Sequence, residues 1–208
     1  GGVCSFDSRG RSASRLSWVR TRGVIIASQT RSFTVHARTD RGIQREGNED
    51  TFLIADLAAG IRAESGGVFH PSETAGGLFL AVCDGMGGAR AGEVASSLAA
   101  DTMFTLLKQV TFPLADADAT LRSSLEQANR VLLDRSNADA ACRGMGTTLT
   151  GVLILDGVGC LGHVGDSRAY LQHGGVLRQL TRDHSLVNFL IDYGVMSTVR
   201  LGSTSGQT

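Results

Sequence analysis

Four carboxylates lie at the ends of apolar, strand-like segments, and their type and position could support chemistry: Glu49, Asp50, Asp84 and Asp166. Carboxylate oxygens are the ligands that Mg²⁺ and Mn²⁺ prefer, and the sequence has no matching cluster of His and Cys that would favour Zn²⁺. Carboxylate-rich sites often hold two metal ions about 3.5–4 Å apart, which bind a phosphate and activate a water molecule. These residues therefore predict a Mg²⁺ or Mn²⁺ site that acts on a phosphate.

Asp84 is the residue on which this prediction depends most. It follows the apolar run 78–83, which predicts a strand buried on both faces, and it precedes a turn that contains Gly85, Gly87 and Gly88. A carboxylate at the end of a buried strand needs a metal ion or another cation as a partner. Glycines let the backbone turn sharply and approach a ligand closely. The alternative is that Asp84 only caps the helix that follows.

Arg45 is the candidate ligand for the phosphate, because its planar guanidinium can bind two oxygens at once. The alternative is a surface ion pair between Arg45 and Glu49, which would contribute little to stability.

Two further residues, His163 and His184, could transfer protons, but an isolated histidine on or beside a strand is more often structural. The sequence contains no Gly-x-x-x-x-Gly-Lys-Ser/Thr loop that would bind phosphate in another way.

The segments that must position these residues show strand-like and helical patterns in separate runs. Strands are predicted at 33–39, 51–55, 78–83, 148–155, 158–164, 169–171 and 176–180, and helices at 89–108, at about 116–135 and from about 181. Residues 56–77 are polar and rich in glycine, which predicts a long loop. Because strands and helices are segregated along the chain, the order favours an α+β fold over an alternating βαβ fold.

Both long helices carry an apolar stripe with the i, i+3, i+4, i+7 spacing that predicts a face packed on the core. In the first helix the stripe consists of Ala91, Val94, Ala95 and Leu98. In the second helix it consists of Leu121, Leu125, Ala128 and Leu132.

Charge is distributed unevenly along a chain whose net charge is zero. Residues 1–32 hold six arginines and one acid, lack periodicity, and are predicted to be a disordered leader. Residues 33–208 hold 14 basic and 19 acidic residues, a net charge of −5, and their length suits one domain. This acidic body argues against nucleic-acid binding. The scattered cysteines fit a reducing compartment, which predicts a cytoplasmic protein, and no apolar run is long enough to span a membrane. We also expect a monomer.

Five motifs occur in an order that carries a resemblance to a known family. They are Arg45…Asn48-Glu-Asp50, Asp84-Gly-Met-Gly-Gly88, Met145-Gly-Thr-Thr-Leu149, Gly162-His-Val-Gly-Asp-Ser-Arg168 and Leu180-Thr-Arg-Asp-His-Ser185. Together they resemble the metal-dependent serine/threonine protein phosphatases (the PPM, or type 2C, family) in its bacterial form. The resemblance extends over roughly residues 33–196.

The resemblance implies a four-layer α-β-β-α sandwich, which is an α+β fold, with a centre of two Mn²⁺ or Mg²⁺ ions and a more weakly bound third ion. It implies hydrolysis of phosphoserine and phosphothreonine on proteins, the products of a Ser/Thr kinase, by a metal-activated water. Arg45 would bind the substrate phosphate. Asp84 would bridge two metal ions, and Gly85 would offer its carbonyl. Glu49 and Asp50 would bind metal directly or through water, and Asp166 would serve the third ion.

Two departures from the family pattern qualify this expectation. Met86 stands where some members have a proton-donating histidine, a trait that bacterial relatives share. The Ser-Asp-Gly and Asp-Asn motifs that supply further metal ligands near the family's C-terminus are not present, and Asp192 is the only acid after His184. We therefore expect a C-terminally truncated phosphatase with impaired activity.

The alternative is a non-catalytic relative that binds phosphoproteins or regulates a partner. A Mg²⁺-dependent nuclease is disfavoured, because it would need a basic groove.

Overall fold

The computed structural model describes residues 24–25, 34–43, 47–63, 66–70, 77–108, 113–155 and 158–184. These form two long helices, α1 (Ala89–Lys108) and α2 (Ala117–Ala138), with short 3-10 turns at Leu114–Asp116 and Ala140–Cys142. The strands are β1 (Val24–Ile25), β2 (Val35–Ala37), β3 (Asp50–Asp56), β4 (Ile61–Arg62), β5 (Gly67–Phe69), β6 (Leu78–Met86), β7 (Gly146–Thr147), β8 (Leu149–Leu155), β9 (Val158–Val164), β10 (Tyr170–His173) and β11 (Val176–Gln179).

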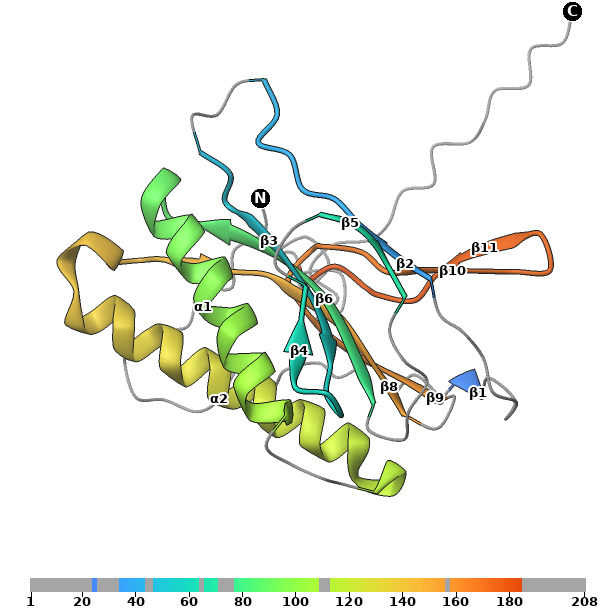
Figure 1. Cartoon of the computed structure of the whole chain (residues 1–208). Coiled ribbons are helices and arrows are strands. Elements are labelled where there is room, and N and C mark those ends of the chain that lie inside the picture. The colour runs from blue at the N-terminus through green and yellow to red at the C-terminus, as the bar shows by residue number, and fades with distance from the viewer. Residues whose placement is uncertain are drawn as a thin grey trace, which may run out of the picture.

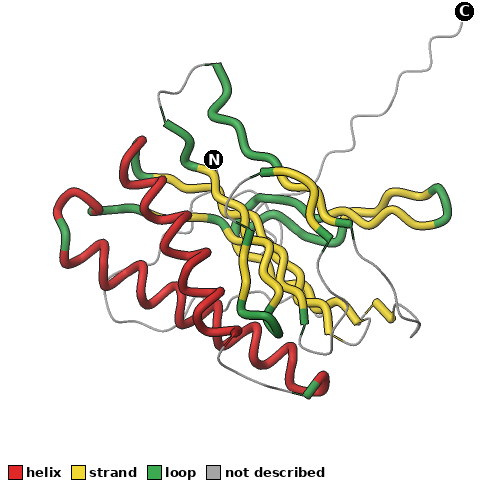
Figure 2. Tube along the Cα trace, viewed as in Figure 1, coloured by secondary structure: helices red, strands yellow, loops and turns green. Residues whose placement is uncertain are grey.

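The main sheet has seven strands in the order β1-β9-β8-β6-β3-β4, with β7 paired to β6. All of its pairings are antiparallel, and β6 lies at its centre between β3 and β8. Both helices cover one face of this sheet (Figures 1 and 2). The fold is therefore α+β with antiparallel sheets, as the motifs predicted.

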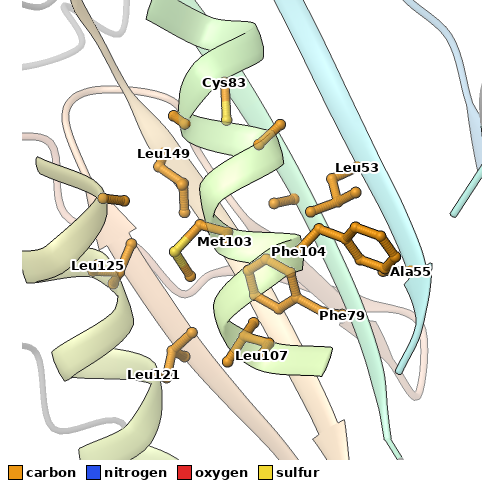
Figure 3. Close-up of a cluster of buried hydrophobic side chains, with 14 of the residues drawn as sticks. Leu53, Ala55, Phe79, Cys83, Met103, Phe104, Leu107, Leu121, Leu125 and Leu149 are labelled. Atoms are coloured by element: carbon orange, nitrogen blue, oxygen red, sulfur yellow. The ribbon is translucent and has the colours of Figure 1, made fainter. Parts of the chain in front are cut away.

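The core lies between the helices and the main sheet (Figure 3). Phe79 of β6, Leu53 of β3 and Met103 of α1 are completely or almost completely buried in it. The predicted stripe of α2 is confirmed, since its four residues are all buried. In α1 the prediction was wrong for Val94, which is 37% exposed. The buried stripe of α1 instead repeats every four residues, through Ala91, Ala95, Ala99 and Met103.

The opposite face of the main sheet carries two small antiparallel sheets, β2–β5 and β10–β11 (Figure 1). Between them and the main sheet lies an apolar groove of about 470 Å³, lined among others by Phe52, Leu80, Val82 and Tyr170. Val82 is 48% exposed there, so the prediction that this strand is buried on both faces was wrong. The helices cover only the face that carries Phe79 and Cys83, and successive side chains of a strand point to opposite faces.

Several predicted boundaries differ from the structure. The predicted loop 56–77 contains the short strands β4 and β5, and the central strand continues beyond Asp84 to Met86. Within the predicted leader, residues 24–25 form β1 and pair with β9, and the rest of that leader lies outside the described residues. Beyond residue 184, the predicted helix that starts at about 181 also lies outside the described residues. No helix in the described part of the chain is long and apolar enough to cross a bilayer.

Candidate active site at one end of the main sheet

Asp50 and Asp84 lie directly opposite each other in the pair β3–β6. Directly paired residues of antiparallel strands share a face of the sheet, with their Cβ atoms about 4.5–5.5 Å apart. Because Cys83 faces the helices, both carboxylates belong to the other face. Like charges placed in this way repel each other unless a cation lies between them. The register thus creates a place that favours a cation, at the end of the sheet where the turn to α1 begins.

Glu49 directly precedes β3 and lies at the same end of the sheet. Its carbonyl oxygen accepts a hydrogen bond from the Gly85 amide at 3.1 Å. A Cβ atom at Gly85 would lie 2.0 Å from the Gly92 carbonyl oxygen, and one at Gly92 would lie 2.9 Å from Oε2 of Glu49. Glycine is therefore required at position 85, where β6 passes the backbone of the first turn of α1. These two glycines allow the Glu49 carboxylate to lie against the start of the helix.

Two threonines hold the backbone of Asp84. The Asp84 amide donates to Oγ1 of Thr148 at 3.0 Å, and the Thr148 amide donates back to the Asp84 carbonyl at 2.9 Å. The hydroxyl of Thr147 lies 3.0 Å from the same carbonyl. The sequence indicated these residues only as part of a motif and did not reveal their role. Two adjacent threonines directly before an apolar strand were the signal that could have drawn attention to them.

Asp166 lies in the loop that follows β9, at the same end of the sheet. Register places Leu149 of β8 opposite Val164 of β9, so the next residues, Thr148 and Gly165, are neighbours. A Cβ atom at Gly165 would lie only 2.6 Å from Cγ2 of Thr148, which shows how closely the loop approaches. The loop carrying Asp166 is therefore separated from Asp84 by Thr148.

The structure thus brings Asp50 and Asp84 together and places Glu49, Gly85 and Asp166 at the same end of the sheet. In the described ranges, however, no group of three or more His, Cys, Asp or Glu side chains could hold a metal ion. The predicted phosphate ligand, Arg45, lies outside those ranges. The chemistry of the donors still fits a hard divalent cation, because all of them offer oxygen.

Both candidate histidines have structural contacts. His163 places Nδ1 2.8 Å from the hydroxyl of Thr150 and Nε2 3.1 Å from the carbonyl oxygen of Arg182. His184 accepts a hydrogen bond from the Gly165 amide at 3.3 Å, and the two imidazole rings lie 4.8 Å apart. Burial, and then the neighbouring His184, lower the pKa of His163. These contacts agree with the structural interpretation of both histidines.

An ion pair near the loop of Asp166 was not predicted. Arg168 donates from Nε and Nη2 to the carboxylate of Asp183, with the shortest distance 2.6 Å. The hydrogen bonds from Arg168 lower the pKa of the Asp183 carboxyl. Both residues belong to the motifs that carried the family resemblance, so their pairing could have been suspected. The pair joins the segment before the β10–β11 hairpin to the segment after it.

Comparisons with known proteins show what the chain is similar to. The family model Protein phosphatase 2C matches residues 68–205. The serine/threonine phosphatase stp of Listeria monocytogenes is 36% identical over 162 residues, which are 77% of this chain and 58% of that protein. The chain therefore spans less than two thirds of the length of this curated relative.

Two of the solved structures that share the fold are both serine/threonine phosphatases. One is the catalytic domain of the serine/threonine protein phosphatase PstP in complex with 2 manganese ions, with a TM-score of 0.57 and 34% identity. The match covers 80% of this chain and 61% of that one. The other is the serine/threonine phosphatase Stp1 of Staphylococcus aureus, with a TM-score of 0.62 and 28% identity, covering 86% of this chain and 63% of that one.

Proposed function

Because the chain belongs to the protein phosphatase 2C family, we propose that it hydrolyses phosphoserine and phosphothreonine on proteins with the help of Mn²⁺ or Mg²⁺. The observation that carries this proposal is the pairing of Asp50 with Asp84 at one end of the main sheet. Two carboxylates that share one face of a sheet are suited to a divalent metal ion, because both offer the oxygen ligands that such ions prefer.

We assign a role to each candidate residue. Asp50 and Asp84 would hold the metal ions, with Asp84 contributing to both, and the carbonyl of Gly85 would be a further ligand. Glu49 binds metal directly or through a water molecule, and Asp166 serves a weaker third ion. When bound, such ions supply a water molecule of lowered pKa and neutralise charge on the phosphoryl oxygens.

Substrate binding is assigned to Arg45. A guanidinium binds two phosphoryl oxygens through parallel hydrogen bonds, which orients the phosphorus for in-line attack. The substrates are proteins phosphorylated by a Ser/Thr kinase, and the catalytic unit is residues 33–208. We further propose a monomeric cytoplasmic protein that does not bind nucleic acid.

The alternative, a non-catalytic relative that binds phosphoproteins, has less support. Such a protein would need Arg45 but would have no use for paired carboxylates, which repel each other when no cation is bound. The phosphatases found by comparison also favour the enzyme. The alternative predicts phosphopeptide binding that is independent of Mn²⁺ and occurs without release of phosphate.

The test is release of phosphate from a phosphothreonine peptide by the full chain, with Mn²⁺ and with a chelator. We expect slow turnover that requires Mn²⁺ and that Asp84→Asn lowers at least about 100-fold, since loss of an indirect partner of a metal ligand already costs 10–100-fold. The matched control is Asp56→Asn at the opposite end of β3, where asparagine can still accept the hydrogen bond from the Ala59 amide. Equal turnover by both variants would contradict the assigned site.

A further inference from the structure

We propose that Thr148 is a positioning residue whose hydroxyl connects the backbone of Asp84 to the loop of Asp166 and so sets the spacing of the proposed metal ligands. This inference rests on the proposed function and extends it to a residue that contacts neither metal nor substrate in that proposal. It follows from the hydrogen bonds, the register and the packing of this one side chain.

The register shows that the hydroxyl takes the place of a backbone acceptor. Gly85 pairs with Thr147, and Val82 pairs with Thr150, so the same alignment places Asp84 opposite Thr148. In a regular ladder, a hydrogen-bonded pair exchanges two bonds between amides and carbonyls. Here the Thr148 amide does donate to the Asp84 carbonyl, but the Asp84 amide donates to the threonine hydroxyl instead. The backbone of Asp84 therefore depends on this side chain.

The same hydroxyl makes a second contact, with the loop. Oγ1 of Thr148 lies 2.7 Å from Oγ of Ser167, the residue after Asp166. A hydroxyl has one hydrogen to donate and two lone pairs to accept with, so one threonine can accept from the Asp84 amide and still bond Ser167. The strand with one proposed ligand and the loop with another are thus joined through a single oxygen atom.

Packing makes the connection rigid. Thr148 is 1% exposed, and its methyl group fills the space against Gly165, where φ is +107°. A Cβ atom at Gly165 would also come within 2.8 Å of the Thr148 Cβ atom. The side chain has little room to move, so the loop can approach β8 in only a narrow range of positions. Valine has nearly the same shape and lacks the hydroxyl, which makes Thr148→Val a specific test.

The control is Thr150→Val, two residues further along β8. Thr150 is also buried, at 5% exposed, and its hydroxyl bonds His163 and the Ser167 carbonyl but has no contact with Asp84. Both substitutions remove one buried hydroxyl from the same strand and keep the branched shape. Thr148→Ser restores the hydroxyl without the methyl group and serves as the rescue variant.

The experiment uses the full chain and two measurements. Without metal, hydrogen exchange at the Asp84 amide should become about tenfold faster in Thr148→Val than in the wild type. The exchange rate should remain unchanged in Thr150→Val and should be close to the wild-type rate in Thr148→Ser. In a calorimetric titration with Mn²⁺, Thr148→Val should bind about tenfold more weakly, and Thr148→Ser should recover most of the affinity.

The outcomes separate the two proposals. Unchanged exchange at Asp84 and unchanged Mn²⁺ affinity in a folded Thr148→Val protein would overturn the positioning role. Equally fast exchange at the Asp84 amide in Thr150→Val would also overturn it, because loss of any buried hydroxyl of β8 would then have the same effect on Asp84. If the wild-type chain does not bind Mn²⁺, the proposed metal centre is wrong, and the exchange measurement alone decides whether Thr148 holds Asp84.

Discussion

In the proposed function, Asp50 and Asp84 are a pair of side chains that favours metal binding over stability. Antiparallel register places the two carboxylates opposite each other, where like charges destabilise the sheet. Removing one charge should therefore have opposite effects on the folded chain and on its affinity for metal.

The first prediction concerns Asp50→Asn. In the absence of metal we expect the free energy of unfolding to rise by about 0.2–1 kcal/mol, because repulsion with Asp84 is removed. With Mn²⁺ the order should reverse, since the wild type gains stability from a ligand that binds only the folded state. Urea unfolding with and without Mn²⁺ measures both effects. An Asp50→Asn protein that is less stable than wild type under both conditions would contradict the assigned pair.

The second prediction concerns pH and His163. Burial and the neighbouring His184 lower the pKa of His163 in the folded state below 6.5, whereas Arg182 and Asp183 partly oppose this shift. The unfolded chain therefore binds more protons at slightly acid pH. The contribution of neutral His163 to stability is fully present above pH 6.5 and is lost as pH falls through the lowered pKa.

This dependence can be measured by urea unfolding between about pH 5 and pH 8, the range in which histidines titrate. His163→Gln should reduce the loss of stability on acidification. The matched control is His173→Gln, at the exposed end of β10, which should keep the wild-type slope. An unchanged slope in His163→Gln would show that another group causes the acid sensitivity.

Among the elements, the contact between β6 and the first turn of α1 depends on two glycines that differ in what surrounds them. A Cβ atom at Gly85 would meet backbone at 2.0 Å, which cannot relax without moving the helix. A Cβ atom at Gly92 would meet the carboxylate of Glu49 at 2.9 Å, and a side chain can rotate away.

The third prediction is therefore a difference between two substitutions. Gly85→Ala should lower the free energy of unfolding by about 3 kcal/mol or more, as overpacking does when it displaces backbone. Gly92→Ala should change it by less than about 1 kcal/mol, because better helix propensity offsets the displaced carboxylate. Thermal or urea unfolding of both variants provides the comparison. Similar losses of stability would contradict the close approach of β6 to α1 at Gly85.

How far the sequence predicted these elements depends on the range of the interactions involved. Helix α1 and the core stripe of α2 followed from a local period of apolar residues, and both predictions were confirmed. Strands β4 and β5 were missed, because segments of two or three residues are too short to show a period. The pairing of Asp50 with Asp84 depends on register between distant segments, which local patterns do not contain. The hydroxyl of Thr148 depends on the same register and could not be assigned a partner.

At the scale of the whole molecule, the main sheet is covered by helices on one face and by two small sheets on the other (Figure 1). Cys83 of the central strand lies on the helix side, where it is 1% exposed and burial raises the pKa of its thiol to about 12. Because the thiolate is the reactive form, this cysteine should be inert while the main sheet is intact.

The fourth prediction follows from this burial. Iodoacetamide should modify Cys83 only in molecules whose main sheet has opened, so its labelling in increasing urea should follow the global unfolding curve. Cys160, which is only partly buried, should react at lower urea concentrations. Mass spectrometry of peptides after a short labelling pulse distinguishes the two sites. Labelling of Cys83 in native buffer as fast as Cys160 would contradict a closed core.

Under the proposed function, the register of the central strand also makes activity a test of correct assembly. Side chains along a strand alternate between faces, so an alignment error of one residue would turn Asp84 toward the helices and leave Cys83 in its place. No intermediate alignment presents half of the site. A misassembled molecule would thus be catalytically silent, and the specific activity of a preparation should measure the fraction of chains that are correctly aligned.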